Sequence, residues 1–197
     1  MSLRLINITK SFGEKKILNC FSYDFPQKGV VALVGDSGIG KTTLLRIIAN
    51  LDDDYDGKVL GGGIKNVSIA FQEYRLLTNL TALENVVLAN SDTKSEADIQ
   101  RATDILLKAG LSEDEINLYP NELSGGMKQR VSLCRAFLRE KPILLLDEPT
   151  KELDSNNVNK ILDIVREIAE KRLVIVVTHS ESDIEYLNAT KIQITKI

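Results

Sequence analysis

The chain has 197 residues, of which 43% are hydrophobic, and its formal net charge is −3 at pH 7. This length can bury one good core with a smaller subdomain attached, which excludes two full domains. The sequence pI near 5.4 gives no overall basic field, so neither a nucleic acid nor an anionic membrane is indicated as a partner.

Cysteine and histidine are too scarce for a disulfide framework or a zinc site, because the chain has two cysteines and one histidine. We expect Cys20 and Cys134 to be small buried hydrophobes in a reducing compartment. The N-terminus lacks the charged-then-apolar pattern of a signal peptide. The longest apolar runs, such as residues 173–177, fall far short of the ~20 residues of a membrane helix. The sequence therefore predicts a soluble chain.

In chain order, the first predicted elements are two alternating segments, Arg4 to Thr9 and Ile17 to Phe25, separated by the turn-like FGEKK. They are typical of an antiparallel β layer. Short continuous apolar runs then indicate strands covered on both faces in a parallel sheet. These runs are Val30 to Val34, Val67 to Phe71, Ile143 to Leu146 and Leu173 to Val177.

Helical periodicity fills the gaps between these strands, and residues 191–197 are expected to form an edge strand. The predicted helices of the α/β core are Lys41 to Ala49, Asn156 to Glu170 and Glu181 to Leu187. Residues 52–57 (DDDYDG) are predicted to be a solvated loop and the glycines 61–63 a turn.

Between Gln72 and Leu138 we find no strand candidate, and segments 80–89, 96–110 and 125–138 all have helical spacing. The prediction is a single domain, 1–197, with an α/β fold. Residues 1–72 and 139–197 form its core, which has a mainly parallel sheet and an N-terminal antiparallel β layer. Residues 73–138 form an inserted helical subdomain.

The segment GDSGIGKTT at 35–43 joins an apolar strand to an apolar helix and fits the pattern G-x-x-x-x-G-K-[ST]. Gly35 and Gly40 let backbone N–H groups surround the β- and γ-phosphates of a nucleotide. Lys41 supplies a compact positive charge, Thr42 offers a hydroxyl to Mg²⁺, and the following helix adds the positive end of its dipole. The predicted ATP-binding residues here are Gly35, Asp36, Ser37, Gly38, Ile39, Gly40, Lys41, Thr42 and Thr43.

The apolar strand 143–146 ends in Asp147 and Glu148, so both acids emerge at the edge of the sheet beside the phosphate loop. Asp147 is expected to be the second anchor of Mg²⁺, through water, because this ion keeps most of its hydration shell. The side chain of Glu148, one residue further on, points in a different direction from that of Asp147 and can polarise the attacking water as a general base.

The octet LSGGMKQR at 123–130, between the phosphate loop and ILLLDEPT, resembles the signature sequence of the ATP-binding cassette (ABC) ATPases. Ser124 can cap a helix, and Gly125 and Gly126 leave backbone N–H groups bare. In this family the signature, here Ser124 to Met127, contacts ATP held by the phosphate loop of the other subunit. The resemblance therefore implies a head-to-tail homodimer with two nucleotides at its interface.

Other family motifs match in order, and each residue also has an ordinary structural alternative. Phe12 matches the aromatic residue that stacks on adenine, or it belongs to the core of the β layer. Gln72 matches the glutamine that reaches Mg²⁺ and the water, or it is a turn residue. His179 matches the switch histidine that contacts the γ-phosphate, or it is a structural histidine. Asp154 matches the acid of the loop that crosses the dimer interface. With Lys41, Glu148 and Gln72, His179 completes the predicted catalytic set.

The match is incomplete at three places. The interface loop is commonly S-A-L-D, whereas this chain has Lys151 and Glu152, and the residue after the switch histidine is often Asp but is Ser180 here. FQEYRLLTNLTALENVVL and YPNELSGGMKQRVSLCRAFL are similar to ATPases of nitrate, sulfonate and taurine importers. Those importers usually have Pro-Trp in place of Thr78 and Asn79.

The resemblance implies an ATP-hydrolysing subunit, with ATP and Mg²⁺ as cofactors, that powers transport through a separate permease. Implied partners are a second copy of the chain, the permease and an extracytoplasmic substrate-binding protein, with no nucleic acid. The implied location is the cytoplasmic face of the cell membrane. A soluble ABC ATPase of iron–sulfur assembly or another non-transport role, and a regulatory module without hydrolysis, stay open as alternatives.

Overall fold

Two sheets and a set of helices make up the computed structural model, which describes residues 2–89 and 95–195. The first sheet has the strand order β2-β1-β4. It contains β1 (Arg4–Phe12), β2 (Lys15–Asp24) and β4 (Asp56–Leu60), all antiparallel. The N-terminal antiparallel β layer is therefore confirmed.

The second sheet is parallel, with the order β5-β6-β7-β3-β8. Its strands are β3 (Gly29–Val34), β5 (Val67–Ala70), β6 (Ile143–Asp147), β7 (Leu173–Val177) and β8 (Thr190–Gln193). The four predicted apolar strands are confirmed, and the expected C-terminal edge strand is confirmed only up to Gln193, because residues 194–195 lie outside β8. Residues 196–197 of the expected edge strand lie outside the described residues.

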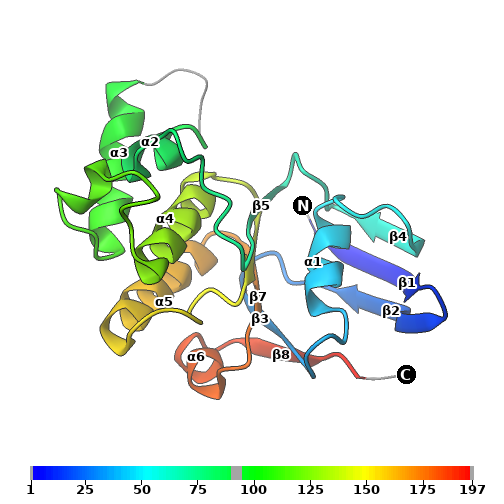
Figure 1. Ribbon diagram of the computed structural model, residues 1–197. Coiled ribbons are helices and arrows are strands. Elements are labelled where there is room, and N and C mark those ends of the chain that lie inside the picture. Colours follow the sequence, from blue (N-terminus) through cyan, green and yellow to red (C-terminus); the bar gives the residue numbers. More distant parts are fainter. Residues whose placement is uncertain (1, 90–94, 196–197) are drawn as a thin grey trace.

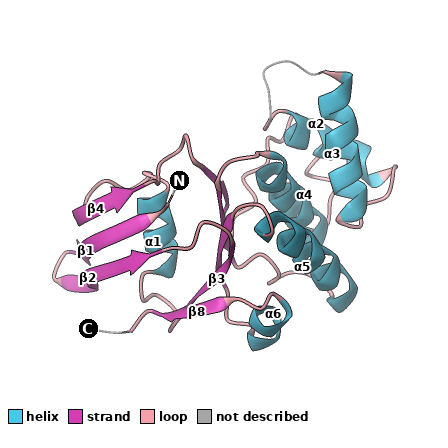
Figure 2. Cartoon of the chain, turned by 180° about the vertical axis from the view of Figure 1, so that it is seen from behind, coloured by secondary structure: helices cyan, strands magenta, loops and turns pink. Residues whose placement is uncertain are grey.

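Helices cover both faces of the parallel sheet. Helix α1 (Lys41–Ile48) lies between the two sheets, and α4 (Gly125–Leu138) and α5 (Ser155–Ala169) lie on the opposite side (Figures 1 and 2). Helix α6 (Glu181–Tyr186) lies beside β8. Beyond α4 are α2 (Ala82–Val87), α3 (Glu96–Lys108) and a short 3₁₀ helix, η1 (Glu115–Asn117).

The continuous apolar runs of the sheet serve two separate cores. Val30 and Ala32 of β3 pack among the helices α2 to α6, whereas Val31 and Leu33 pack against α1 and the antiparallel layer. Side chains alternate across a strand, so a strand covered on both faces needs apolar residues at every position. This two-sided burial fixes the carboxyl ends of the strands, where the candidate site lies.

Three sequence predictions need correction. The loop predicted at residues 52–57 is shorter than expected, because Asp56 and Gly57 begin β4, which pairs with β1. The FGEKK turn is shorter than expected, because β1 continues to Phe12 and β2 begins at Lys15. Cys134 is buried as predicted, but Cys20 is exposed on β2 with a φ of 50°.

Candidate active site

The phosphate loop leaves β3 and enters α1 through a series of left-handed glycines. Gly35 has a φ of 149° and Gly40 a φ of 108°. A Cβ atom on Gly35 would lie 2.5 Å from the backbone oxygen of Ile194, next to β8. Only glycine fits this backbone and this close approach. The loop is therefore shaped by its own dihedral angles and by the C-terminal segment.

Two side chains at the start of α1 point into the loop and toward β6. Lys41 is buried, and its Nζ donates to the carbonyl oxygens of Gly35 at 2.7 Å and Asp36 at 2.9 Å. The Thr42 hydroxyl donates to Oδ2 of Asp147 at 2.8 Å. Two of the three residues predicted to hold Mg²⁺ are thus adjacent, although 105 positions separate them in sequence.

Asp147 is 2% exposed at the end of β6, and its burial raises the pKa of its carboxyl above the ordinary value. Glu148 follows with a φ of 52°, in the left-handed region that a residue with a side chain rarely adopts. Its backbone N–H donates to the carbonyl oxygen of Val177 at 2.9 Å. This bond joins the exits of β6 and β7.

The Glu148 carboxylate faces His179, with 3.3 Å between Oε1 of Glu148 and Nε2 of His179. Burial raises the pKa of Glu148, and the nearby His179 partly opposes that shift. A half-buried carboxylate with a raised pKa, next to an imidazole, is suited to accept a proton from water. The strained backbone of Glu148 is of a kind that clusters at active sites.

These groups line one cavity of about 530 Å³. The predicted site residues that line it are Phe12, Ser37, Gly38, Gly40, Lys41, Thr42, Thr43, Gln72, Asp147, Glu148 and His179. Phe12 is 56% exposed, so it is not part of the core of the β layer. The side chain of Ile39 instead packs in the core beside α1, and Gly35 and Asp36 are not among the lining residues.

The predicted signature residues lie elsewhere. Ser124 caps α4 by accepting a hydrogen bond from the backbone N–H of Met127 at 3.2 Å, as the sequence predicted. Asp154 caps α5 through the backbone N–H of Asn157 at 3.1 Å, and this bond lowers the pKa of Asp154. Neither Asp154 nor Ser124 to Met127 lines the 530 Å³ cavity.

The unusual Glu152 has a partner within the same chain. Its carboxylate accepts a hydrogen bond from the hydroxyl of Tyr74 and lies against Gly125 at the start of α4. This bond is the main cause that raises the pKa of Tyr74 to about 12. The loop after Glu148 is thus connected to the segment that follows Gln72.

Sequence reasoning missed two buried polar residues that support the site. Gln129 on α4 is 3% exposed and donates to the carbonyl oxygen of Pro149 at 3.2 Å. Asp183 on α6 is 6% exposed and accepts a hydrogen bond from Thr150. Gln129 lies inside the octet quoted above, and an amide on the apolar side of a helix is the signal that could have revealed it.

The donor set suits a hard cation that also binds phosphate. Thr42 and Asp147 offer a hydroxyl and a carboxylate oxygen in contact with each other, and Gln72 lines the same cavity. Among the described residues no group of three or more His, Cys, Asp or Glu side chains is placed to hold a metal ion. A cation here would therefore depend on phosphate and water for its remaining ligands.

This arrangement of a glycine loop, a lysine, a threonine–aspartate pair and a glutamate–histidine pair defines a P-loop ATPase. A family model described as "ABC transporter" matches residues 18–151, and the chain belongs to that family. The chain is accordingly an ATP-binding ABC transporter ATPase, and the resemblance noted in its motifs is confirmed.

Curated relatives include importer ATPases. The chain is 37% identical over 174 residues to the aliphatic sulfonates import ATP-binding protein SsuB 1 of Paracoccus denitrificans, covering 87% of this chain and 70% of that protein. It is 37% identical over 199 residues to the sulfate/thiosulfate import ATP-binding protein CysA of Escherichia coli, covering 93% of this chain. The chain spans about half of that relative's length, 54%.

A solved structure agrees over almost the whole chain. The dimeric post-hydrolysis state of the ATP-binding cassette MJ0796 bound to ADP and Pi superposes with a TM-score of 0.87 at 31% identity. The match covers 98% of this chain and 94% of that chain. The α/β fold predicted from sequence is therefore confirmed. Among the described residues, no helix has both the length and the apolarity to cross a membrane.

Proposed function

We propose that this ATPase is the nucleotide-binding subunit that powers substrate transport across a membrane through a separate permease, as in importers of the nitrate, sulfonate and taurine type. The observation that carries the proposal is the single cavity in which Lys41, Asp147, Glu148 and His179 meet around the phosphate loop. Relatives named for sulfonate and sulfate import support the importer assignment.

Within that cavity each group has a distinct role. Residues 35–43 wrap the phosphates, and Phe12 at the rim stacks on the adenine. Thr42, Gln72 and Asp147 would hold Mg²⁺, which neutralises charge that develops on the phosphate oxygens. Glu148 accepts a proton from the attacking water, and His179 holds Glu148 and contacts the γ-phosphate.

The signature residues Ser124 to Met127 lie outside the cavity that holds the phosphate loop. We therefore assign them to the nucleotide of a second copy of this chain, with Asp154 in the loop that crosses between the two copies. The dimeric cassette MJ0796, bound to ADP and Pi, supports this assignment. ATP binding closes the homodimer and hydrolysis opens it.

We assign a second cavity, of about 340 Å³, as the surface that docks on the permease. We call it the Phe71 groove; Leu51, Ile64, Phe71, Leu77 and Leu88 are among its lining residues. Phe71 and Arg75 border this groove while Gln72 borders the nucleotide cavity. One short segment thus lies between a docking groove and the catalytic groups. The proposed location is the inner face of the cell membrane, with an extracytoplasmic substrate-binding protein delivering the substrate.

The test replaces Glu148 with Gln, which keeps the shape of the side chain but removes its basicity. ATP should still bind, turnover should fall by ~10²-fold or more, and a dimer should accumulate with Mg-ATP. Steady-state phosphate release and light scattering measure both effects, with exposed Glu113→Gln as the matched control. Near-normal turnover in Glu148→Gln would remove Glu148 from its role.

Affinity purification from membranes tests the transport assignment separately. Recovery of the chain with an integral membrane protein supports the permease, whereas recovery with soluble scaffold proteins would favour the non-transport alternative.

A further inference from the structure

Asp183 is a buried carboxylate that the proposed catalytic scheme does not use. It lies on α6 and is 6% exposed. Its Oδ2 accepts a hydrogen bond from the Thr150 hydroxyl at 2.5 Å, and its Oδ1 accepts one from the Ser180 hydroxyl at 2.7 Å. Burying a carboxylate costs free energy unless hydrogen-bond donors compensate it, so the Asp183 carboxylate needs the hydroxyls of Thr150 and Ser180.

The two donors belong to the two loops that carry the catalytic pair. Thr150 follows Glu148 by two residues, and Ser180 directly follows His179. The exits of β6 and β7 are already joined by the bond from Glu148 N–H to the Val177 carbonyl. Asp183 adds a second connection between the two loops, through Thr150 on one and Ser180 on the other.

The backbone of Glu148 needs such support, because its φ of 52° is strained for a residue with a side chain. On one side, Gln129 donates to the carbonyl oxygen of Pro149 at 3.2 Å. On the other side, Thr150 is held by Asp183. The turn that carries Glu148 is thus fixed from α4 and from α6.

We propose that Asp183 is a positioning residue for hydrolysis: through Thr150 and Ser180 it holds Glu148 and His179 in register across the ends of β6 and β7. The inference rests on the proposed role of Glu148. The family commonly has an acid directly after the switch histidine, whereas this chain has Ser180. In this chain the carboxylate of Asp183, one turn further along α6, accepts a hydrogen bond from the Ser180 hydroxyl.

Thr150→Val gives the cleanest test, because it keeps the shape of the side chain and removes only the hydroxyl. Ser180 is less suitable, since its hydroxyl also caps α6 by accepting from the Asp183 backbone N–H. We expect Thr150→Val to lower kcat by about tenfold, since small misplacements of catalytic groups are costly. Nucleotide affinity should stay within about twofold of wild type, because no phosphate contact is removed.

A spectroscopic signal reports the geometry independently of turnover. His179 is the only histidine in the chain, so its ring Cε1–Hε1 NMR signal needs no assignment. The signal should shift in Thr150→Val and in Asp183→Asn, and return in Thr150→Ser, which restores a hydroxyl. Thr103→Val, which removes an exposed hydroxyl bonded to the Ile99 carbonyl on α3, is the matched control.

Loss of kcat together with a shifted His179 signal, both rescued by Thr150→Ser, supports the inference. A wild-type kcat and an unmoved His179 signal in Thr150→Val would overturn it, as would a loss that Thr150→Ser does not rescue. Normal turnover in Glu148→Gln is a different failure: it refutes the proposed catalytic scheme, while the His179 signal still decides whether Asp183 sets the geometry.

Discussion

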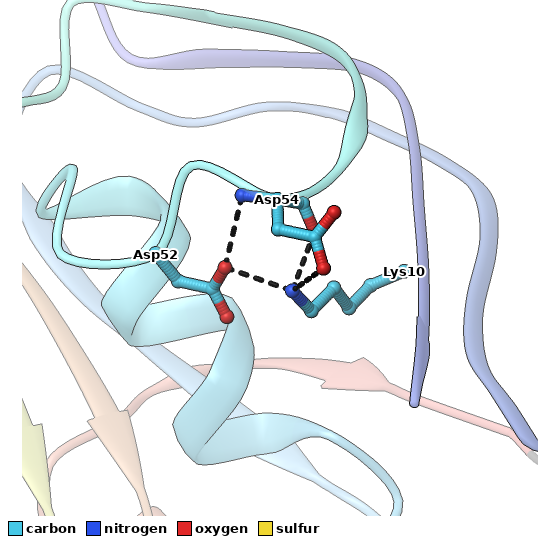
Figure 3. A network of polar contacts seen from close by, with 3 residues as sticks. All are labelled: Lys10, Asp52 and Asp54. Carbon is cyan, nitrogen blue, oxygen red and sulfur yellow. Dashed lines mark hydrogen bonds and ion pairs between the residues drawn. The ribbon is translucent and has the colours of Figure 1, made fainter. Parts of the chain in front are cut away.

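At the scale of single residues, Lys10 shows how a buried charge joins distant segments. It lies on β1, is 3% exposed, and its Nζ contacts Oδ1 of Asp52 at 2.8 Å and Oδ2 of Asp54 at 3.2 Å (Figure 3). Both acids follow α1, and Lys10 Nζ also lies 5.0 Å from the ring centroid of Phe12. Lys10 thus lies between the segment that follows α1 and Phe12, which lines the nucleotide cavity.

Lys10→Met should destabilise the protein by about 2 kcal/mol, because it removes the charge-assisted hydrogen bonds from Lys10 to Asp52 and Asp54. The hydrogen bond to Asp52 is the main cause that raises the pKa of Lys10 above 10.5. The raised pKa means that this contribution is fully present below pH 10.5 and is lost as the pH rises through the folded-state pKa.

Chemical denaturation of Lys10→Met and wild type from about pH 6 to about pH 9 should therefore give a constant difference. Lys16→Met is the control, since Lys16 is exposed on β2 and its change should fall within about 0.5 kcal/mol. Equal stability of Lys10→Met and wild type would contradict the role given to the network.

The sequence revealed residues that belong to contiguous motifs and missed those defined by contacts. Lys41 and Thr42 were predicted because the chemistry of the phosphate loop requires them at fixed spacing. Gln129 and Asp183 were missed, because their roles depend on loops that only the folded chain brings to them. Cys20 was predicted to be buried, but it lies on the exposed side of β2.

At the scale of elements, strands covered on both faces were predictable, whereas β4, at the edge of the antiparallel sheet, was not. The runs at 143–146 and 173–177 are apolar at every position, and both are fully buried. Strand β4 contains Asp56, Gly57 and Lys58, which favour a loop. It forms because β1 offers unpaired backbone groups along its edge, and one sequence segment alone cannot reveal that partner.

The Tyr74–Glu152 bond connects two loops, and its effect on the pKa of Tyr74 can be measured. Because that pKa is raised to about 12, Tyr74 should remain neutral at about pH 11. In Glu152→Gln the acceptor loses its charge, so the pKa of Tyr74 should fall toward about 10. The stabilisation from this bond is present below pH 10 and is lost as the pH rises toward 12.

Carbon-13 NMR of the tyrosine ring carbons across alkaline pH follows this ionisation, and Tyr74→Phe identifies the signal. Glu113→Gln, which alters an exposed glutamate elsewhere, should leave the Tyr74 signal unchanged. If the signal titrated at the same pH in Glu152→Gln and wild type, the bond would not exist in solution.

At the scale of the whole molecule, the Phe71 groove provides the test of assembly. Ile64 lines the groove and is 64% exposed. Ile64→Glu should abolish sedimentation of the protein with membranes that contain its permease, because a charge on an apolar contact cannot be desolvated cheaply. ATP binding should persist, since Ile64 does not line the nucleotide cavity.

Leu60→Glu is the matched control, because Leu60 is 48% exposed on β4 and lies outside the groove. It should sediment with membranes as wild type does. Normal sedimentation of Ile64→Glu would exclude the Phe71 groove as the docking surface.

The architecture of the whole chain was predictable because its motifs occur in a fixed order along a recognisable alternation of strands and helices. It was harder to predict from the sequence which surfaces of the folded chain face each other. Phe12 and His179 lie near opposite ends of the chain; the family motifs predicted that both contact the nucleotide, and the fold shows that both border one cavity. The division at residues 73 and 138 stays a prediction.

The contact between Gly35 and the Ile194 carbonyl has a consequence for synthesis on the ribosome. The backbone N–H of Ile194 also donates to the carbonyl oxygen of Val34 at 2.8 Å, so a late segment braces the first turn of the phosphate loop. The ribosome synthesises the phosphate loop long before Ile194, so the loop of the nascent chain at first lacks this hydrogen bond. The ability of the loop to bind a nucleotide should therefore mature only after Ile194 has been synthesised.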